Sequence, residues 1–131
     1  MFKKIDHVEL IPADFERSIK FYTDVIGFKL IWRVKPQSSN LDEIVFVELG
    51  GSQIEIKSAK NPAPFDDSVR IGLPRLCLLT DDLEGALALL KTKGVDAAGP
   101  VRSAAGPSGT RLKLAEIKDP DGLSIELMER R

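Results

Sequence analysis

The strongest constraint on the fold is an internal repeat, because residues 1–58 and 75–131 carry the same signals in the same order. Each part opens with a strand segment, continues with an aspartate and an apolar helical stripe, and closes with a strand that has a glutamate at its centre. The matching positions are Asp14 and Asp82, Gly27 and Gly94, and Ile54-Glu55-Ile56 and Ile125-Glu126-Leu127. The repeat predicts an α+β fold made of two tandem βαβββ modules.

The first module, residues 1–58, begins with alternation from Lys4 to Ile11. Asp14 is a typical N-cap and apolar residues follow it at helical spacing, so we expect a helix over residues 14–26. Gly50-Gly51 predicts a hairpin between two strands. The strands expected after the helix cover Phe28–Lys35, Glu43–Leu49 and Gln53–Ser58.

Residues 59–74 interrupt the pattern with prolines and a glycine, so we interpret them as a linker. The second module, residues 75–131, has a helix expected over residues 82–93. A loop rich in Gly, Pro and Ser is expected over Ser103–Gly109, and a turn at Asp119-Pro-Asp-Gly122. The strands expected in this module cover Arg75–Thr80, Val95–Val101, Arg111–Ile117 and Leu123–Met128.

Charge and composition exclude several function classes. The 131 residues include 19 basic and 20 acidic side chains, a net charge of −1, so we expect neither nucleic acid nor a membrane as a partner. No apolar run reaches the roughly 18 residues that a membrane helix needs, and the start has no signal-peptide pattern. The single cysteine, Cys77, lies in an apolar strand where we expect it to pack. One cysteine makes no internal disulfide, which indicates the cytoplasm.

The candidate site follows from strand alternation. Neighbouring side chains in a strand point to opposite faces, and one helix covers only one face of a four-stranded sheet. His7, the single histidine, and Glu55 and Glu126 all fall on the uncovered face. Each alone is an ordinary surface residue, but Glu55 and Glu126 correspond across the repeat. If the sheets curl around this face, an imidazole and two carboxylates converge in a cup and form the ligand set of a divalent cation.

Three motifs carry a family resemblance. His7-Val-Glu-Leu opens the first strand, Ser18-Ile-Lys-Phe-Tyr22 precedes Val25-Ile-Gly-Phe28, and Lys118-Asp-Pro-Asp-Gly-Leu-Ser-Ile-Glu-Leu127 contains the last strand. Together they resemble the vicinal oxygen chelate superfamily, which includes glyoxalase I, bleomycin-resistance proteins, methylmalonyl-CoA epimerase and extradiol dioxygenases. The resemblance spans essentially the whole chain. It implies one domain over residues 1–131, a cupped mixed sheet with the helices outside, and a homodimer.

By this resemblance, the metal ligands stand on the first and last strands of each module, at His7, Glu55, Arg75 and Glu126. The family usually has a histidine where this chain has Arg75, and a guanidinium offers no lone pair to a metal. The dioxygenase and fosfomycin-transferase branches use two histidines, so we expect neither activity. The expected ligands are therefore His7, Glu55 and Glu126, holding a divalent ion such as Zn, Ni, Co, Fe or Mn.

Two functions remain open. The first is a glyoxalase I-like, metal-dependent lyase or isomerase, similar to lactoylglutathione lyase, acting on a small substrate with vicinal oxygens. There the ion stabilises an enediolate and Glu126 is the expected base. The second is a metal-free protein that binds a small molecule, similar to the bleomycin-resistance branch, with Arg75 in place of the ion neutralising Glu55 and Glu126. We favour the first, because a protein that never binds metal has no need of the His-Glu-Glu set.

Overall fold

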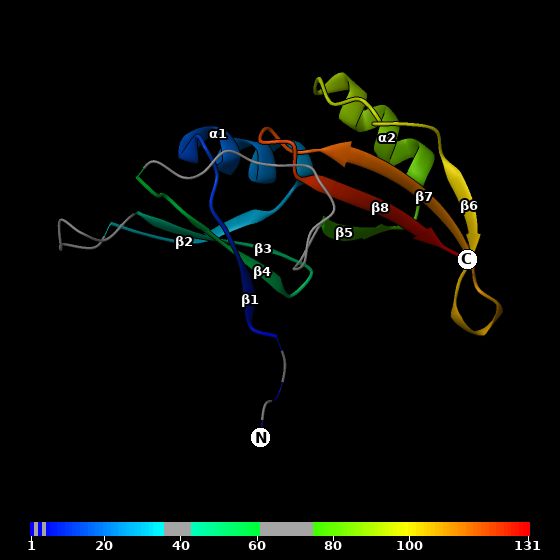
Figure 1. Cartoon of the computed structure of the whole chain (residues 1–131), viewed down its shortest axis with the longest axis horizontal. Coiled ribbons are helices and arrows are strands. Elements are labelled where there is room, and N and C mark those ends of the chain that lie inside the picture. The colour runs from blue at the N-terminus through cyan, green and yellow to red at the C-terminus, as the bar shows by residue number, and fades with distance from the viewer. Residues whose placement is uncertain (2, 4, 36–42, 61–74) are drawn as a thin grey trace. The chain divides into compact units, whose positions relative to one another are not determined.

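The computed structural model describes residues 1, 3, 5–35, 43–60 and 75–131, and the chain divides into two compact units, Met1–Pro64 and Phe65–Arg131 (Figure 1). Both units have the element order βαβββ. The sequence prediction of an α+β fold made of two such modules is therefore confirmed. None of the helices in the described ranges is long and apolar enough to cross a membrane.

The first unit is a four-stranded mixed sheet in the order β1-β4-β3-β2. β1 runs parallel to β4, and the other neighbours are antiparallel. One continuous helical segment connects β1 to β2 and changes from α-helical to π-helical hydrogen bonding halfway along. The elements are β1 (His7–Leu10), α1 (Phe15–Lys20), η1 (Phe21–Ile26), β2 (Lys29–Val34), β3 (Ile44–Leu49) and β4 (Ser52–Lys57).

The helical segment begins and ends where the sequence indicates. The Asp14 side chain accepts a hydrogen bond from the backbone N–H of Arg17 at 3.0 Å, which satisfies one of the unpaired donors of the first turn. Gly27, with φ of 103°, adopts the left-handed conformation that ends the segment. The segment lies against one face of the sheet (Figure 1), where alternate strand residues are fully or almost fully buried. These residues are Val45, Val47, Ile54 and Ile56.

The second unit repeats this arrangement, with a sheet in the order β5-β8-β7-β6. β5 and β8 are parallel, and the β8–β7 and β7–β6 pairs are antiparallel. The buried side chains under α2 again alternate along the strands and include Ala115, Ile117, Ile125 and Leu127. The elements are β5 (Arg75–Thr80), α2 (Leu83–Thr92), β6 (Arg102–Ala105), η2 (Pro107–Gly109), β7 (Arg111–Lys118) and β8 (Ser124–Arg130).

Two carboxylates satisfy the start of α2. The Asp82 side chain accepts a hydrogen bond from the N–H of Gly85, and the Glu129 carboxylate, on β8, accepts one from the N–H of Leu83, both at 2.9 Å. Glu129 is only 2% exposed and also pairs with Arg131. The bond from Leu83, helped by Arg131, lowers the pKa of the Glu129 carboxyl below its ordinary value of 4.5. Glu129 therefore ties the helix to the last strand.

One expected strand is wrong. Residues 95–101 form no strand, and β6 lies instead over Arg102–Ala105, where it overlaps the start of the predicted loop Ser103–Gly109. Gly99, with φ of 154°, and Pro100, which has no N–H to donate, interrupt any ladder across that stretch. The expected helices and the other strands are present with ends shifted by a few residues.

Most of the predicted linker 59–74 lies outside the described residues, because residues 61–74 are not among them. The organisation of both modules as one domain and the cup that would join their sheets stay predictions.

Glu129 gives a prediction for acid stability. A carboxyl with a lowered pKa in the folded state stabilises the fold above its unfolded pKa, and this stabilisation is lost as the pH falls below 4.5 and through the folded value. We expect Glu129→Gln to lower the free energy of unfolding at neutral pH. We also expect the free energy of unfolding of this variant to depend less on pH in the acid range. Urea unfolding at several pH values measures both effects. The control is Glu84→Gln on the exposed side of α2, and equal behaviour of the two variants would contradict the prediction.

Candidate functional site

Each sheet leaves one face uncovered by its own helix, and the strand register fixes which side chains share that face. In the first unit, Glu9 is the partner of Glu55 and Phe46 pairs with both Glu55 and Trp32. A register shift between Leu30 and Trp32 is what brings Trp32 opposite Phe46. The open face of the first sheet thus combines carboxylates with an aromatic pair whose ring centroids are 5.6 Å apart.

His7 and Glu55 lie together on this face, and we call them the first half-site. His7 Nε2 is 3.0 Å from Glu55 Oε2, and His7 Nδ1 is 2.9 Å from Asp6 Oδ2. The imidazole also meets the edge of Phe46, at a centroid distance of 5.0 Å. The hydrogen bond with Asp6, followed by the charge of Glu55, raises the pKa of His7 above its ordinary value of 6.5.

The donor atoms of the first half-site fit a divalent ion. Two ligands at about 2.1 Å from the same ion, as imidazole nitrogen and carboxylate oxygen are, lie roughly 3 Å apart when adjacent in its coordination shell. The 3.0 Å separation of His7 Nε2 and Glu55 Oε2 matches that geometry. Asp6 on the other ring nitrogen is the type of partner that orients ligating histidines.

The second half-site consists of Arg75, Cys77, Arg102 and Glu126, on the open face of the second sheet. Arg75 Nη1 is 3.3 Å and Arg102 Nη2 is 3.9 Å from the same carboxylate oxygen, Glu126 Oε2. The other oxygen, Oε1, accepts a hydrogen bond from the Cys77 thiol, with Sγ at 3.7 Å. Burial, followed by the charge of Glu126, raises the pKa of Cys77. The guanidiniums therefore hold one carboxylate oxygen and leave the other to a weaker donor.

A second carboxylate lies directly across the strand pair from Glu126. Glu116 on β7 is its antiparallel partner, and like charges in such a position repel. Lys118 Nζ lies 2.9 Å from Glu116 Oε1 and lowers the pKa of that carboxyl. Lys118 thus compensates Glu116, and Arg75 and Arg102 compensate Glu126.

The structure brings the predicted residues together in pairs. His7 contacts Glu55, and Arg75 contacts Glu126, while the convergence of both pairs around one ion stays a prediction. His7 and Arg75 are the first residues of β1 and β5, so the pairs occupy corresponding places in the repeat. Within the parts of the chain that the structure describes, no three His, Cys, Asp or Glu side chains gather as a metal site.

Sequence reasoning missed three members of these clusters. Cys77 was expected to pack in the core, but it is exposed and faces Glu126, because its register partner on β8 is Glu126 itself. Arg102 fell between the expected strand Val95–Val101 and the expected loop Ser103–Gly109 and was given no role. Asp6 gave no signal beyond its place next to His7. Alternation from Arg75 would have placed Cys77 on the same face as Arg75.

Comparison with protein families agrees with the repeated βαβββ fold described above. A model described as "Glyoxalase/Bleomycin resistance protein/Dioxygenase superfamily" matches residues 4–127. The chain belongs to this superfamily. The family resemblance predicted from the three motifs is therefore confirmed.

Individual members of the superfamily agree with this assignment. A "Probable lactoylglutathione lyase" of Vibrio parahaemolyticus is 31% identical over 131 residues, covering 96% of this chain and 90% of that protein. A chloroplastic protein of the same name from Arabidopsis thaliana is 30% identical over 130 residues, and this chain spans 36% of its length. The crystal structure of a glyoxalase family protein from Enterococcus faecalis, 27% identical, superposes with a TM-score of 0.80 and covers 98% of both chains.

The environment of His7 predicts its titration. Asp6 and Glu55 both raise its pKa, so we expect Asp6→Asn and Glu55→Gln each to lower the pKa of His7 toward 6.5, Asp6→Asn more strongly. Because the chain has one histidine, proton NMR of the metal-free protein follows its ring signals without ambiguity. Glu16→Gln on α1 is the control and should leave the curve unchanged. An unchanged curve in both test variants would show that the contacts of His7 are misassigned.

Proposed function

We propose that this protein is a glyoxalase I-like, metal-dependent isomerase of the lactoylglutathione lyase type, acting on a small substrate with vicinal oxygens. The main support is the first half-site, where an imidazole nitrogen and a carboxylate oxygen lie 3.0 Å apart. The two lactoylglutathione lyase relatives, about 30% identical over almost the whole of this chain, support the same class of reaction.

In this proposal His7, Glu55 and Glu126 hold a divalent ion, Zn, Ni, Co, Fe or Mn, when the two half-sites meet. The ion, when bound, stabilises negative charge on the vicinal oxygens of the substrate. As the base, Glu126 would loosen from the ion. Its Oε1, the oxygen that neither guanidinium contacts, would take the proton from the neighbouring carbon and return it to the adjacent one. Arg75 and Arg102 fix the orientation of that carboxylate through Oε2. Phe46 and Trp32 give the apolar portion of the substrate a surface beside His7.

The enzyme proposal predicts separate effects on metal and on turnover. His7→Ala and Glu55→Ala should weaken metal binding more than about a hundredfold, because even the outer partners of metal ligands are worth about 10–100-fold. Glu126→Gln should lower the isomerisation of the glutathione–methylglyoxal hemithioacetal by about 10²–10⁴-fold. Metal analysis and a product assay measure these effects, with urea unfolding expected to change little.

The matched control for these variants is Glu9→Gln, which removes a carboxylate from the same face of β1. It should keep both the metal content and the turnover. Unchanged metal content in His7→Ala or Glu55→Ala would show that the proposed site is misplaced.

The second candidate is a metal-free protein that binds a small molecule, and the contacts of Glu126 favour it. Arg75 already neutralises this carboxylate at 3.3 Å, with Arg102 close by at 3.9 Å. In this reading the guanidinium takes the place of the ion. A contact between Arg75 and Glu55, which the same reading requires, stays a prediction.

Arg75 distinguishes the two candidates by metal binding. The side chain is 44% exposed and its partner Glu126 18%, so their pair contributes about 0.2–1 kcal/mol, and Arg75→Ala should hardly alter the free energy of unfolding. If the protein is the enzyme, we expect the unsubstituted protein to bind metal and Arg75→His to bind it more tightly, because the substitution adds an imidazole ligand. For the metal-free protein, metal binds only after Arg75 is replaced. Calorimetric titration with Zn²⁺ and Co²⁺ decides, and tight binding confined to the Arg75 variants would overturn the enzyme proposal.

The proposal also covers the partner of the protein, its oligomeric state and its location. A small molecule is the expected partner, and a homodimer in the cytoplasm is the expected state. The two half-sites would then meet within one chain or between two copies of it.

A further inference from the structure

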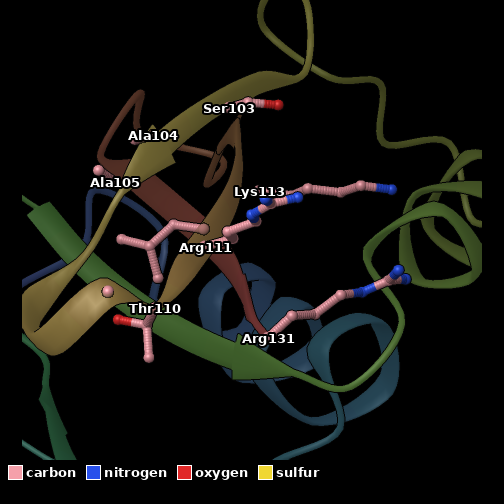
Figure 2. Close-up of a pocket in the computed structure, with 9 residues that line it drawn as sticks. Ser103, Ala104, Ala105, Thr110, Arg111, Lys113 and Arg131 are labelled. Carbon is pink, nitrogen blue, oxygen red and sulfur yellow. The ribbon is translucent and has the colours of Figure 1, made fainter.

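Besides Arg75 and Arg102, which contact Glu126, a second cluster of basic side chains lies at the end of the β6–β7 hairpin. A pocket of about 660 Å³ is lined there by residues of β6, of β7 and of the connection between them, and by Arg131, which follows β8 (Figure 2). Three of its lining residues are cationic, Arg111, Lys113 and Arg131. Lys113 is the register partner of Glu129, which faces α2, whereas Glu126 is on the opposite face of the sheet. The pocket cations and the proposed catalytic carboxylate therefore belong to different faces.

The three cationic side chains extend toward the same side in Figure 2. Lys113 Nζ lies 3.1 Å from Glu84 Oε1, and Arg131 pairs with Glu129 through Nε. Arg111 forms no ion pair with any other residue that the structure describes. Two side-chain carboxylates thus accompany the three cations, and the guanidinium of Arg111 keeps all its donors available.

The chemistry of these groups indicates the ligand. Arginine presents a planar set of N–H donors that matches a phosphate or carboxylate, and lysine adds a point charge. A phosphate carries up to two negative charges and three acceptor oxygens, which suits two guanidiniums and an ammonium better than one carboxylate does. The pocket volume is that of small-molecule sites, about 300–1,000 Å³, and is much larger than a free phosphate needs. Ala104, Ala105 and Leu112 also line it.

We propose that this pocket binds a phosphate-bearing small organic molecule, with Arg111, Lys113 and Arg131 on the phosphate and the apolar lining against the organic portion. The site does not depend on the proposed isomerase activity, since none of the half-site residues lines it.

Adenosine monophosphate, adenosine and inorganic phosphate are suitable probes for the whole chain. We expect AMP to bind more tightly than inorganic phosphate and adenosine to bind hardly at all. In two-dimensional NMR, AMP should shift the backbone amides of Ser103, Thr110, Arg111 and Lys113 and leave that of Glu126 in place. Arg111→Gln should weaken AMP binding about tenfold, the loss expected for one charge-assisted hydrogen bond.

The matched control is Arg130→Gln, which removes the same charge near the end of β8 on the opposite face. It should leave AMP binding unchanged, and the NMR spectrum of each variant shows that it is folded. Equal weakening in Arg111→Gln and Arg130→Gln would mean a general attraction of anions to a basic surface and would overturn the proposal. AMP binding no tighter than that of adenosine would overturn it as well.

Discussion

The structure depends on how one helix covers a four-stranded sheet. In each unit the helical segment buries a layer of aliphatic side chains on one face, such as Val45, Val47 and Ile56 in the first unit. Burial of this kind is the main contribution to folding, at about 25 cal/mol per Å² of apolar surface. Each helix packs on one face of its sheet only. The opposite face is not buried by it and can therefore carry charged side chains. Both half-sites lie on these opposite faces.

Because each sheet has one apolar, covered face and one polar face, much of the architecture can be predicted from the sequence. The two-residue period of a strand separates Ile54 and Ile56 from Glu55, so the faces could be assigned before any strand pairing was known. Asp14 and Asp82 mark helix starts because a short polar side chain there satisfies a free N–H. Alternation put His7 and Glu55 on the same face, and the contact between them also requires that β1 and β4 are neighbours, which the structure shows.

Other features depend on contacts that no local pattern encodes. The change to π-helical bonding after Lys20 has no separate sequence signal, because the apolar stripe continues through it. Strand alternation places Glu129 on the face that the helix covers. Its hydrogen bond from the N–H of Leu83, however, requires that β8 pass beneath the start of α2. Arg102 reaches Glu126 only because β6 begins after Pro100. Each of these depends on tertiary structure or on strand ends, which alternation alone does not define.

The correspondence between His7 and Arg75 has a consequence for how the two modules respond to their surroundings. Both residues open the first strand of a module and both pair with the glutamate of its last strand. Imidazole gains and loses its proton close to neutral pH, whereas guanidinium keeps its charge at any pH that a cell reaches. The symmetry of the repeat is thus broken in charge, although the two residues keep corresponding places. Acidification charges the imidazole and converts its hydrogen bond with the Glu55 carboxylate to an ion pair, whereas the Arg75–Glu126 contact is an ion pair from the start, so the two modules differ in their response to acid.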